Sequence, residues 1–147
     1  MHPIRPAGLL AAMTVLLAAC GTESTDLDGP YDLVVRGSAD FGEPHGGQPI
    51  EVALVDEEGR VKATRSGVVS ATADPSFQFD FPEELLSGRV YSLRYWIDSN
   101  IEGGDEGECD PPEIDHQWRF QIAVGYWNVE WTAVYDVGLM ADVCDTF

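Results

Sequence analysis

The chain has 147 residues, and 44% of them are hydrophobic, which suits one domain with a packed core. Eight Lys and Arg residues face 26 Asp and Glu residues, and the formal net charge is −18. Nucleic acid and bare anionic lipid headgroups repel a polyanion of this strength, so both are poor partners.

The first 19 residues have the layout of a secretory signal. A short basic start with His2 and Arg5 precedes an apolar run from Ala7 to Ala19. A helix over this run is about 20 Å long, whereas the hydrocarbon core of a bilayer is about 30 Å thick. The segment therefore predicts export rather than a permanent membrane span.

The residues Leu17-Ala18-Ala19-Cys20 resemble the lipobox of bacterial lipoproteins. The resemblance implies that the signal peptide, residues 1–19, is removed, that the Cys20 thiol carries acyl chains such as palmitate, and that the new amine is acylated too. Two or more chains anchor a protein stably, because each buried CH₂ contributes about 0.8 kcal/mol. The alternative is an ordinary secretory signal that contains a cysteine by chance.

Residues 20–30 make up the lipidated cysteine and a tether. The stretch from Gly21 to Pro30 has one apolar side chain, which is typical of a flexible linker. Gly21 stands where Asp, in enteric-type bacteria, signals retention in the inner membrane, so we expect a lipid-anchored protein of the outer membrane of a bacterial cell envelope. Residues 31–147 form the predicted domain.

Two cysteines, Cys109 and Cys144, remain once Cys20 is assigned to lipid, and two thiols in an exported protein favour a disulfide. For an enclosed loop of about 35 residues, chain entropy predicts a stabilisation of about 4 kcal/mol. The alternative is a redox pair or a two-cysteine metal site, but no further thiol or histidine cluster accompanies the two residues in the sequence.

Alternation of apolar and polar residues with period two is the repeating pattern of the domain. It predicts seven strands at 31–35, 50–54, 61–64, 77–81, 91–97, 118–122 and 127–133, with Val68-Val69 as a candidate eighth. Pro82 is expected to end the fourth strand, and Glu83 to Ser87 to form one helical turn. One-sided alternation predicts an all-β fold, a single antiparallel β-sandwich of seven to eight strands of the immunoglobulin-like kind.

An ordered series of motifs runs through residues 47–97. The strand Pro-Ile-Glu-Val-Ala-Leu-Val-Asp and a hairpin precede the aromatic strand Phe77-Gln78-Phe79, and Leu-x-Gly-x-x-Tyr ends at Tyr91. This order resembles transthyretin-like and carboxypeptidase-regulatory-like sandwiches, a resemblance that implies a fold but no single function. In immunoglobulin-type folds a tyrosine here bonds its hydroxyl to upstream backbone, and Tyr91 is the candidate for this tyrosine corner.

Residues 98–116, which we name the acidic loop, are the region best suited to chemistry. Eight carboxylates and no Lys or Arg lie between positions 98 and 115. A hard divalent cation such as Ca²⁺ would relieve their repulsion, and Asp-x-Asn-x-Glu-Gly matches the first half of a calcium-binding loop. Cys109 stands where the closing Glu is expected, so the alternative is a solvated loop held by Cys109. The predicted calcium ligands are Asp98, Asn100, Glu102, Asp105 and Glu106.

Two histidines, His45 and His116, remain after the predicted cleavage. His45 is expected in a turn. Asp115 beside His116 invites an acid–base interpretation, but neighbours on a strand point to opposite faces, and no nucleophile motif accompanies them. We predict no catalytic residue. The alternative is an envelope hydrolase that uses Asp115 and His116, or a carboxylate pair in the same loop.

The four tryptophans divide by their phase in the predicted strands. Trp118, Trp127 and Trp131 fall on the apolar phase, which predicts core positions. Trp96 falls on the opposite phase beside the acidic loop, so it is the candidate contact for a ligand. Ordinary packing is the alternative for Trp96.

These observations predict a lipid-anchored, non-enzymatic β-sandwich of the cell envelope that acts as a binding or structural module. Its expected partners are the membrane, through the anchor, and an envelope protein or a glycan, with Ca²⁺ as the candidate cofactor. Besides the hydrolase, a purely structural accessory remains, in which the acidity of the chain serves solubility and spacing from anionic lipid.

Overall fold

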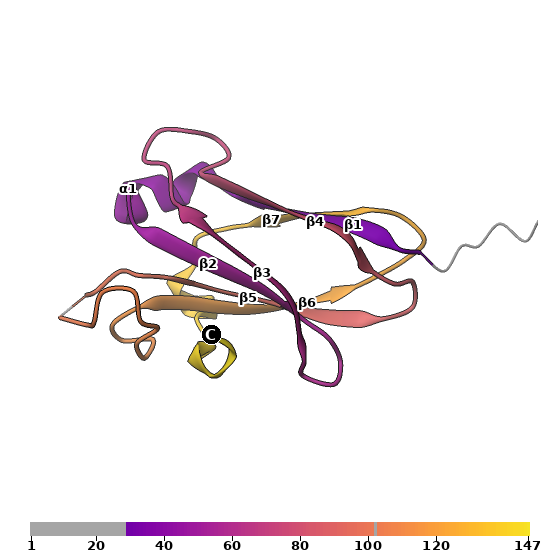
Figure 1. The fold of residues 1–147 in the computed structure, drawn as a ribbon. Helices are drawn as coiled ribbons and strands as arrows, with labels where there is room; N and C mark the ends of the chain where they lie inside the picture. The colour runs from indigo at the N-terminus through magenta and orange to yellow at the C-terminus, as the bar shows by residue number, and fades with distance from the viewer. Residues whose placement is uncertain (1–28, 102) are drawn as a thin grey trace, which may run out of the picture.

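Seven strands form two sheets that pack face to face (Figure 1). The computed structural model describes residues 29–101 and 103–147. One sheet has the strand order β4-β1-β7 and the other β3-β2-β5-β6. The predicted all-β sandwich is therefore confirmed, with seven strands among the described residues.

The bounds of the strands follow the predicted segments closely. The three-stranded sheet consists of β4 (Phe77–Leu85), β1 (Tyr31–Gly37) and β7 (Val129–Ala133). The four-stranded sheet consists of β3 (Val61–Val68), β2 (Pro49–Val55), β5 (Val90–Ile97) and β6 (His116–Ala123). Four strand pairs are antiparallel, as predicted, whereas β1 and β7 run parallel.

The alternation in the sequence sorts side chains between core and solvent. In β4, Phe77, Phe79 and Phe81 face inward and are at most 9% exposed, while the residues between them face water. From the opposite sheet, Tyr95 and Trp118 are fully buried and stack with ring centroids 5.2 Å apart. Aromatic side chains bury about 150–250 Å² each, so these five rings supply much of the hydrophobic stabilisation.

Two short helical elements after β1 were not predicted. They are η1 (Ala39–Phe41) and α1 (Gly42–His45), and composition indicated only a turn there. Phe41 is fully buried, and its burial pulls this connection onto the core. His45 is 1% exposed as a result, rather than lying in a solvated turn.

β4 continues past Pro82 to Leu85, where the sequence predicted a stop and a helical turn at Glu83–Ser87. That prediction is wrong because β4 is an edge strand, and a proline at an edge removes no hydrogen bond from the ladder. Glu83 adopts a φ of 56°, and its N–H donates to the Asp32 carboxylate at 2.9 Å.

Two smaller predictions also differ from the structure. Val68 ends β3 instead of starting an eighth strand. Trp127, predicted in the core, is 66% exposed because β7 begins two residues later. Trp118 is buried as predicted, and Trp131 is half-buried.

Tyr91 forms the predicted tyrosine corner. Its side chain is buried, and its hydroxyl accepts a hydrogen bond from the backbone N–H of Leu86 at 3.1 Å. The bond ties the start of β5 to the end of β4 and so fixes the connection between the two sheets.

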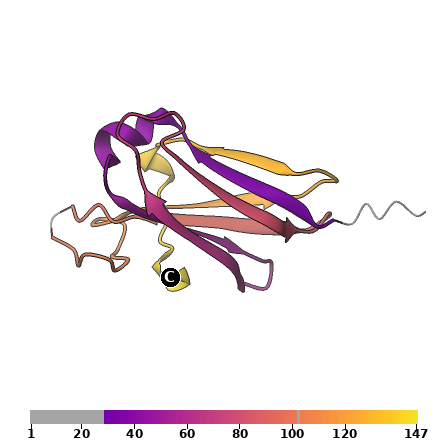
Figure 2. The ribbon, with the colours of Figure 1, turned by 45° about the horizontal axis from the view of Figure 1, so that its top comes forward.

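The two ends of the sandwich carry different features (Figures 1 and 2). The acidic loop and α1 lie at one end, and the described chain enters at the other end with Gly29. After β7 the chain passes from the three-stranded sheet to the outer side of the four-stranded sheet, with η2 (Val137–Leu139) and η3 (Cys144–Thr146) on the way. No helix in the described part of the chain is long and apolar enough to cross a membrane.

Candidate functional site

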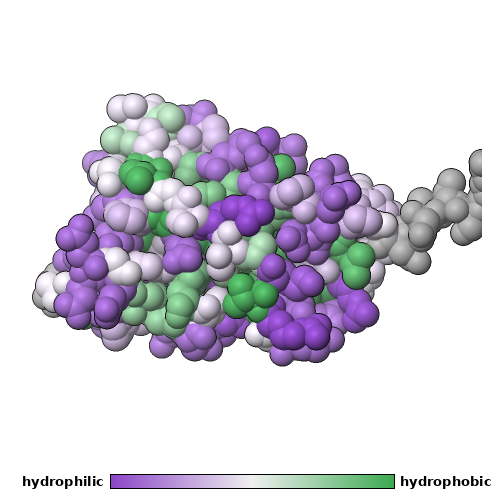
Figure 3. Space-filling view, in the orientation of Figure 1, coloured by the Kyte–Doolittle hydropathy of each residue, from purple (hydrophilic) through white to green (hydrophobic). Residues whose placement is uncertain are grey.

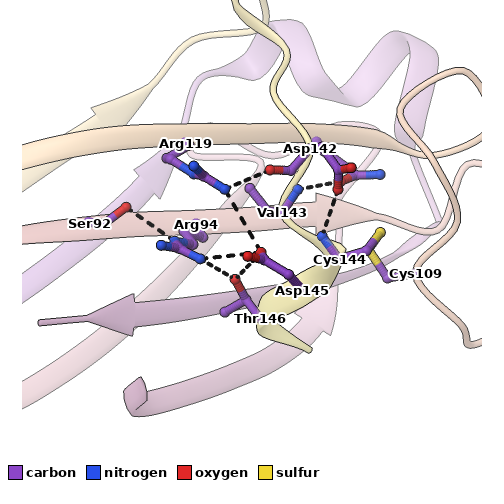
Figure 4. Close-up of polar contacts among 10 residues, drawn as sticks. Ser92, Arg94, Cys109, Arg119, Asp142, Val143, Cys144, Asp145 and Thr146 are labelled. Atoms are coloured by element: carbon purple, nitrogen blue, oxygen red, sulfur yellow. Dashed lines mark hydrogen bonds and ion pairs between the residues drawn. A yellow bond between two sulfur atoms is a disulfide. The ribbon is translucent and has the colours of Figure 1, made fainter. Parts of the chain in front are cut away.

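The C-terminal segment, residues 140–147, lies on the outer face of the four-stranded sheet and is held there covalently. Cys109 of the acidic loop and Cys144 of η3 form the predicted disulfide, with Cα atoms 5.4 Å apart (Figure 4). The bridge therefore fastens the acidic loop to the C-terminal segment, as the cysteine count predicted.

Two arginines hold the same segment through polar contacts (Figure 4). Arg94 of β5 donates to Thr146 Oγ1 at 2.7 Å and to the Asp145 carboxylate at 3.3 Å. Arg119 of β6 donates to the Asp142 carbonyl at 2.7 Å and lies 3.8 Å from the Asp145 carboxylate. The Arg94 side chain is only 17% exposed, so solvent screens its contacts less than those of an ordinary surface pair.

Trp96 projects from the outer face of the sheet, as its phase in β5 predicted, but it is not accessible. Its side chain is 5% exposed, and Phe147 packs edge-on against it with ring centroids 6.2 Å apart. The indole N–H is buried and has no partner among the described residues. The C-terminal segment thus covers the candidate ligand contact.

Gln117 joins three parts of the chain, and sequence reasoning missed it. Its side chain is fully buried at the start of β6. Nε2 donates to the Asp110 carbonyl of the acidic loop, and Oε1 accepts from the Val143 N–H at 2.8 Å. A buried amide needs such partners, so loop, strand and C-terminal segment keep fixed places.

Asp115 and Asp98 organise the acidic loop from inside. The fully buried Asp115 carboxylate accepts three backbone hydrogen bonds, which come from Ser99, Asn100 and Asp110. Asp98 is 4% exposed and accepts from the Gly107 N–H at 2.8 Å and from the side-chain amide of Asn100. Hydrogen bonds to a charged acceptor are about twice as strong as neutral ones, so these bonds give the loop a defined shape.

The predicted calcium ligands are only partly brought together. Glu102 lies outside the described residues, and Asp105 and Glu106 are exposed. Asn100 Oδ1 is buried with no hydrogen-bond partner among the described residues, and Asn100 lies two positions from Asp98. Among the described residues, no group of three or more His, Cys, Asp or Glu side chains is placed to hold a metal ion. Calcium binding therefore stays a prediction.

His45 and His116 are 71 positions apart in the sequence and form a hydrogen-bonded pair. His116 Nδ1 lies 2.9 Å from His45 Nε2, and His45 Nδ1 lies 2.6 Å from Gln48 Oε1. Because an amide oxygen only accepts, His45 donates from Nδ1, and its Nε2 accepts from His116. Tyr135 packs against both rings, with centroids 5.3 Å from His45 and 5.9 Å from His116.

Burial lowers the pKa of both histidines. For His45, desolvation is the largest cause; the hydrogen bond with Gln48 opposes the change, and the neighbouring His116 adds to it. For His116, desolvation lowers the pKa and the charge of Asp115 opposes the change. The surroundings thus favour the neutral form of both imidazoles.

The hydrolase alternative needs His116 close to a carboxylate. The structure records no hydrogen bond between the described side chains of Asp115 and His116, since Asp115 bonds to backbone N–H groups and His116 to His45. Asp115 and His116 are adjacent in the sequence but bond to different groups. The pairing of His116 with His45 has no local sequence signal, because a tertiary contact creates it.

A shallow depression on the outer face gathers most of the described basic residues. It consists of two adjoining hollows, the smaller of about 110 Å³, that share the lining residues Asp56, Glu57, Val90 and Tyr91. Five of the seven described Lys and Arg residues line it, namely Arg60, Lys62, Arg89, Arg94 and Arg119. Neighbouring carboxylates pair with most of them. The depression is therefore a mixed-charge, hydrogen-bonding surface on an acidic domain.

The surface in view in Figure 3 is mainly hydrophilic, and hydrophobic residues appear there in small separate groups. Five exposed hydrophobic residues instead flank β7 along the chain. Their exposed fractions range from 49% to 66%, and they are Tyr126, Trp127, Val134, Val137 and Leu139.

Comparison with known proteins finds only distant similarity to solved structures. No family model matches the chain, and neither does any curated protein. One similar solved structure is a protein of proposed polysaccharide-binding role from Bacteroides thetaiotaomicron, with 12% identity and a TM-score of 0.42 over 71% of this chain and 46% of that chain. Another is a fimbrial assembly protein from Parabacteroides distasonis, with 10% identity and a TM-score of 0.39 over 71% of this chain and 51% of that chain. This chain spans about half the length of each.

Proposed function

We propose that the protein is a lipid-anchored, non-enzymatic binding module of the bacterial cell envelope. The observation that carries the proposal is that the buried carboxylates Asp98 and Asp115 bond to N–H groups of the acidic loop itself. A general acid or base needs a free oxygen directed at the substrate. Carboxylates used as internal acceptors give instead a fixed loop surface, which suits recognition.

The orientation of the domain supports this proposal. The described chain begins at Gly29, at the end of the sandwich away from the acidic loop (Figure 1). An anchor at Cys20 would join the domain at the end opposite the acidic loop, so the loop would not lie at the attachment point. The formal charge of −18 would keep the domain off anionic headgroups.

An envelope glycan or an envelope protein is the partner class that we propose. The mixed-charge depression between the β2–β3 hairpin and β5 offers guanidinium donors beside carboxylate acceptors. Adjacent hydroxyl groups of a sugar need such donors and acceptors side by side, and a few polar groups with defined positions give a binding site its specificity.

Lipidation is tested on the full chain expressed in a bacterium that processes lipoproteins. We expect mass spectrometry of the membrane-extracted protein to show a chain that begins at an acylated Cys20. Cys20→Ser should move the protein out of the membrane fraction. Cys144→Ser is the matched control, because it removes a cysteine of the domain and leaves the anchor. A membrane-extracted protein with an unmodified Cys20 would contradict the anchor.

Binding is separated from hydrolysis by incubating the purified protein with envelope polysaccharide. We expect the protein to be retained on the polysaccharide without the release of shorter fragments. If fragments appear and His116→Gln abolishes them, the hydrolase alternative is correct.

Calcium binding in the acidic loop is a separable part of the proposal, supported by Asn100 Oδ1, which is buried with no hydrogen-bond partner in the described part of the chain. Thermal unfolding is measured with a chelator and then with excess Ca²⁺. A site at 100 times its Kd gains about 2.7 kcal/mol of stability. Asp105→Asn should reduce the gain, whereas Glu113→Gln, which changes a loop acid outside the predicted ligand set, should keep it. An unchanged melting temperature would contradict calcium binding.

A further inference from the structure

The four edges of the two sheets differ in how they are protected. They are β4 and β7 in the three-stranded sheet, and β3 and β6 in the four-stranded sheet. An edge strand presents unpaired N–H and C=O groups that pair readily with another strand, unless a side chain, a proline or a covering segment prevents it.

β3 and β4 protect each other on one side of the sandwich. Arg65 of β3 donates from Nε to the Asp80 carbonyl of β4 at 3.0 Å, and its guanidinium lies 4.9 Å from the centre of the Phe81 ring. Pro82 removes a further donor from the edge of β4. A partner strand therefore meets an obstructed edge on this side.

The C-terminal segment covers the first half of β6. Trp118 pairs with Met140 in an isolated bridge, and the Ala141 N–H donates to the Gln117 carbonyl at 3.1 Å. The side chain of Arg119 holds the same segment from the next position.

β7 keeps its outer edge open. The Ser38 N–H donates to the Ala133 carbonyl at 2.9 Å, so Ala133 directs its backbone groups at β1. The backbone N–H and C=O groups of successive residues point to opposite sides of a strand. Those of Val129 and Trp131 therefore also point at β1, and those of Glu130 and Thr132 point away from it. No backbone group of another described segment bonds to Glu130 or Thr132. Two donors and two acceptors are thus available on this edge.

The core next to this edge is incompletely covered. Trp131 is half-buried and packs on the half-buried Phe120 of β6, with ring centroids 5.4 Å apart. The Trp131 indole N–H is buried without a partner among the described residues. The exposed hydrophobic residues Tyr126, Trp127 and Val134 stand at the two ends of the strand. An added strand would bury apolar surface as well as pair with the backbone.

We infer that the outer edge of β7 binds an extended, basic segment of a partner protein, which adds to the three-stranded sheet as a fourth strand. Apolar residues at every second position of this segment would cover Trp131 and Phe120, and Lys or Arg residues between them would face solvent. The charge selects this occupant. Glu130 beside the edge pairs with Arg36 and is still 70% exposed, and the net charge of −18 attracts a basic segment but repels a second copy of the chain. The inference names the partner class of the module proposed above and rests on that proposal.

The test uses the purified full chain and the synthetic peptide Lys-Val-Lys-Ile-Lys-Val-Lys. The control peptide Lys-Pro-Lys-Pro-Lys-Pro-Lys carries the same charge and cannot form a regular strand. Hydrogen exchange of the Glu130 and Thr132 amides is measured at physiological salt. We expect the first peptide to slow exchange at both amides and the control to leave them unchanged. If both peptides slow exchange equally, the interaction depends on charge alone and the inference is overturned.

Two substitutions at one position separate the edge from the fold. Thr132→Pro removes an N–H that points outward and takes no bond from the β1–β7 ladder, so we expect about tenfold weaker peptide binding. Thr132→Val keeps the N–H and the branched shape, so it should keep the affinity. Circular dichroism checks the fold of each variant. If Thr132→Pro does not fold, Glu130→Lys, which reverses the charge on the exposed face, should weaken binding in a folded protein.

Three outcomes have distinct meanings. A dimer of the chain that Thr132→Pro dissociates would make a second copy the occupant and overturn the inference. If Cys20 is acylated but the peptide does not slow exchange at the β7 edge, the inference is wrong and the envelope proposal still stands. Peptide binding by a protein that is never acylated would support the edge and contradict the anchor.

Discussion

Tyr95 shows how one residue can oppose the stability of the fold that it builds. Its side chain is fully buried between the sheets, and its hydroxyl has no hydrogen-bond partner among the described residues. Burial raises the pKa of this hydroxyl far above its ordinary value, so the group stays neutral. An unpaired buried hydroxyl costs about 1–3 kcal/mol.

Tyr95→Phe removes the unpaired hydroxyl and keeps the ring. We expect the protein to be more stable by about 1 kcal/mol, or about 4 °C in melting temperature, measured by circular dichroism. Tyr91→Phe is the matched control, because the Tyr91 hydroxyl accepts from Leu86 and its loss should lower stability by about 1 kcal/mol. A destabilised Tyr95→Phe would show that the hydroxyl has a partner.

The histidine pair makes the stability of the folded state depend on pH. Both pKa values lie below the ordinary value of 6.5, chiefly because of burial. Below that pH the unfolded chain binds more protons than the folded chain, so stability falls as the pH drops from 6.5 toward the lowered values. We expect urea unfolding to show this loss between pH 7.5 and pH 5.5, and His116→Gln to reduce it. Equal stability across this range would contradict the buried, neutral pair.

At the scale of elements, the disulfide adds a covalent link to the polar contacts that hold the C-terminal segment. The double variant Cys109→Ser, Cys144→Ser leaves the contacts of Arg94 and Gln117 in place but removes the covalent link. For a loop of about 35 residues, we expect a loss of about 4 kcal/mol in urea unfolding. Arg94→Gln keeps the bridge and should cost less, because its partner Asp145 is 73% exposed and such ion pairs contribute about 1 kcal/mol or less. If Arg94→Gln loses more stability than the double cysteine variant, this prediction is wrong.

The strands were predictable because apolar and polar residues alternate in the sequence, and a strand buries every second side chain. The inward row of Phe77, Phe79 and Phe81 is the clearest case. The continuation of β4 beyond Pro82 was not predictable, because it depends on the edge position of β4, which only the assembled sheet defines. The same holds for α1, which forms where the burial of Phe41 draws its connection onto the core.

The candidate site was predictable only in part. Once Cys20, which lies outside the described residues, is set aside, two cysteines remain in the sequence, so the pairing of Cys109 with Cys144 follows from counting. The contact of His45 with His116, and the bonds of Gln117, join positions that are far apart in the chain. Which carboxylate turns inward, as Asp115 does, depends on where the N–H groups of the folded loop point.

At the scale of the whole molecule, the net charge of −18 opposes compaction. Raising the salt concentration from about 0.01 M to 0.15 M shortens the Debye length from about 30 Å to about 8 Å, and screened repulsion favours the folded state. We expect the melting temperature to rise over this range. Glu106→Gln with Glu108→Gln, both exposed, should raise it at low salt and weaken its salt dependence. Glu130→Gln, which breaks the pair with Arg36, is the control and should not stabilise.

The parallel pairing of β1 with β7 governs the order in which the chain can fold. The contact between Asp32 and Asn128 bridges 96 positions, so β1, the central strand of its sheet, gains its second neighbour only once the chain as far as β7 is available. Closing a loop of this length is slow compared with forming a hairpin. In a chain emerging from N-terminus to C-terminus, through a ribosome or a membrane pore, this sheet would therefore stay incomplete and vulnerable to proteases until β7 had arrived.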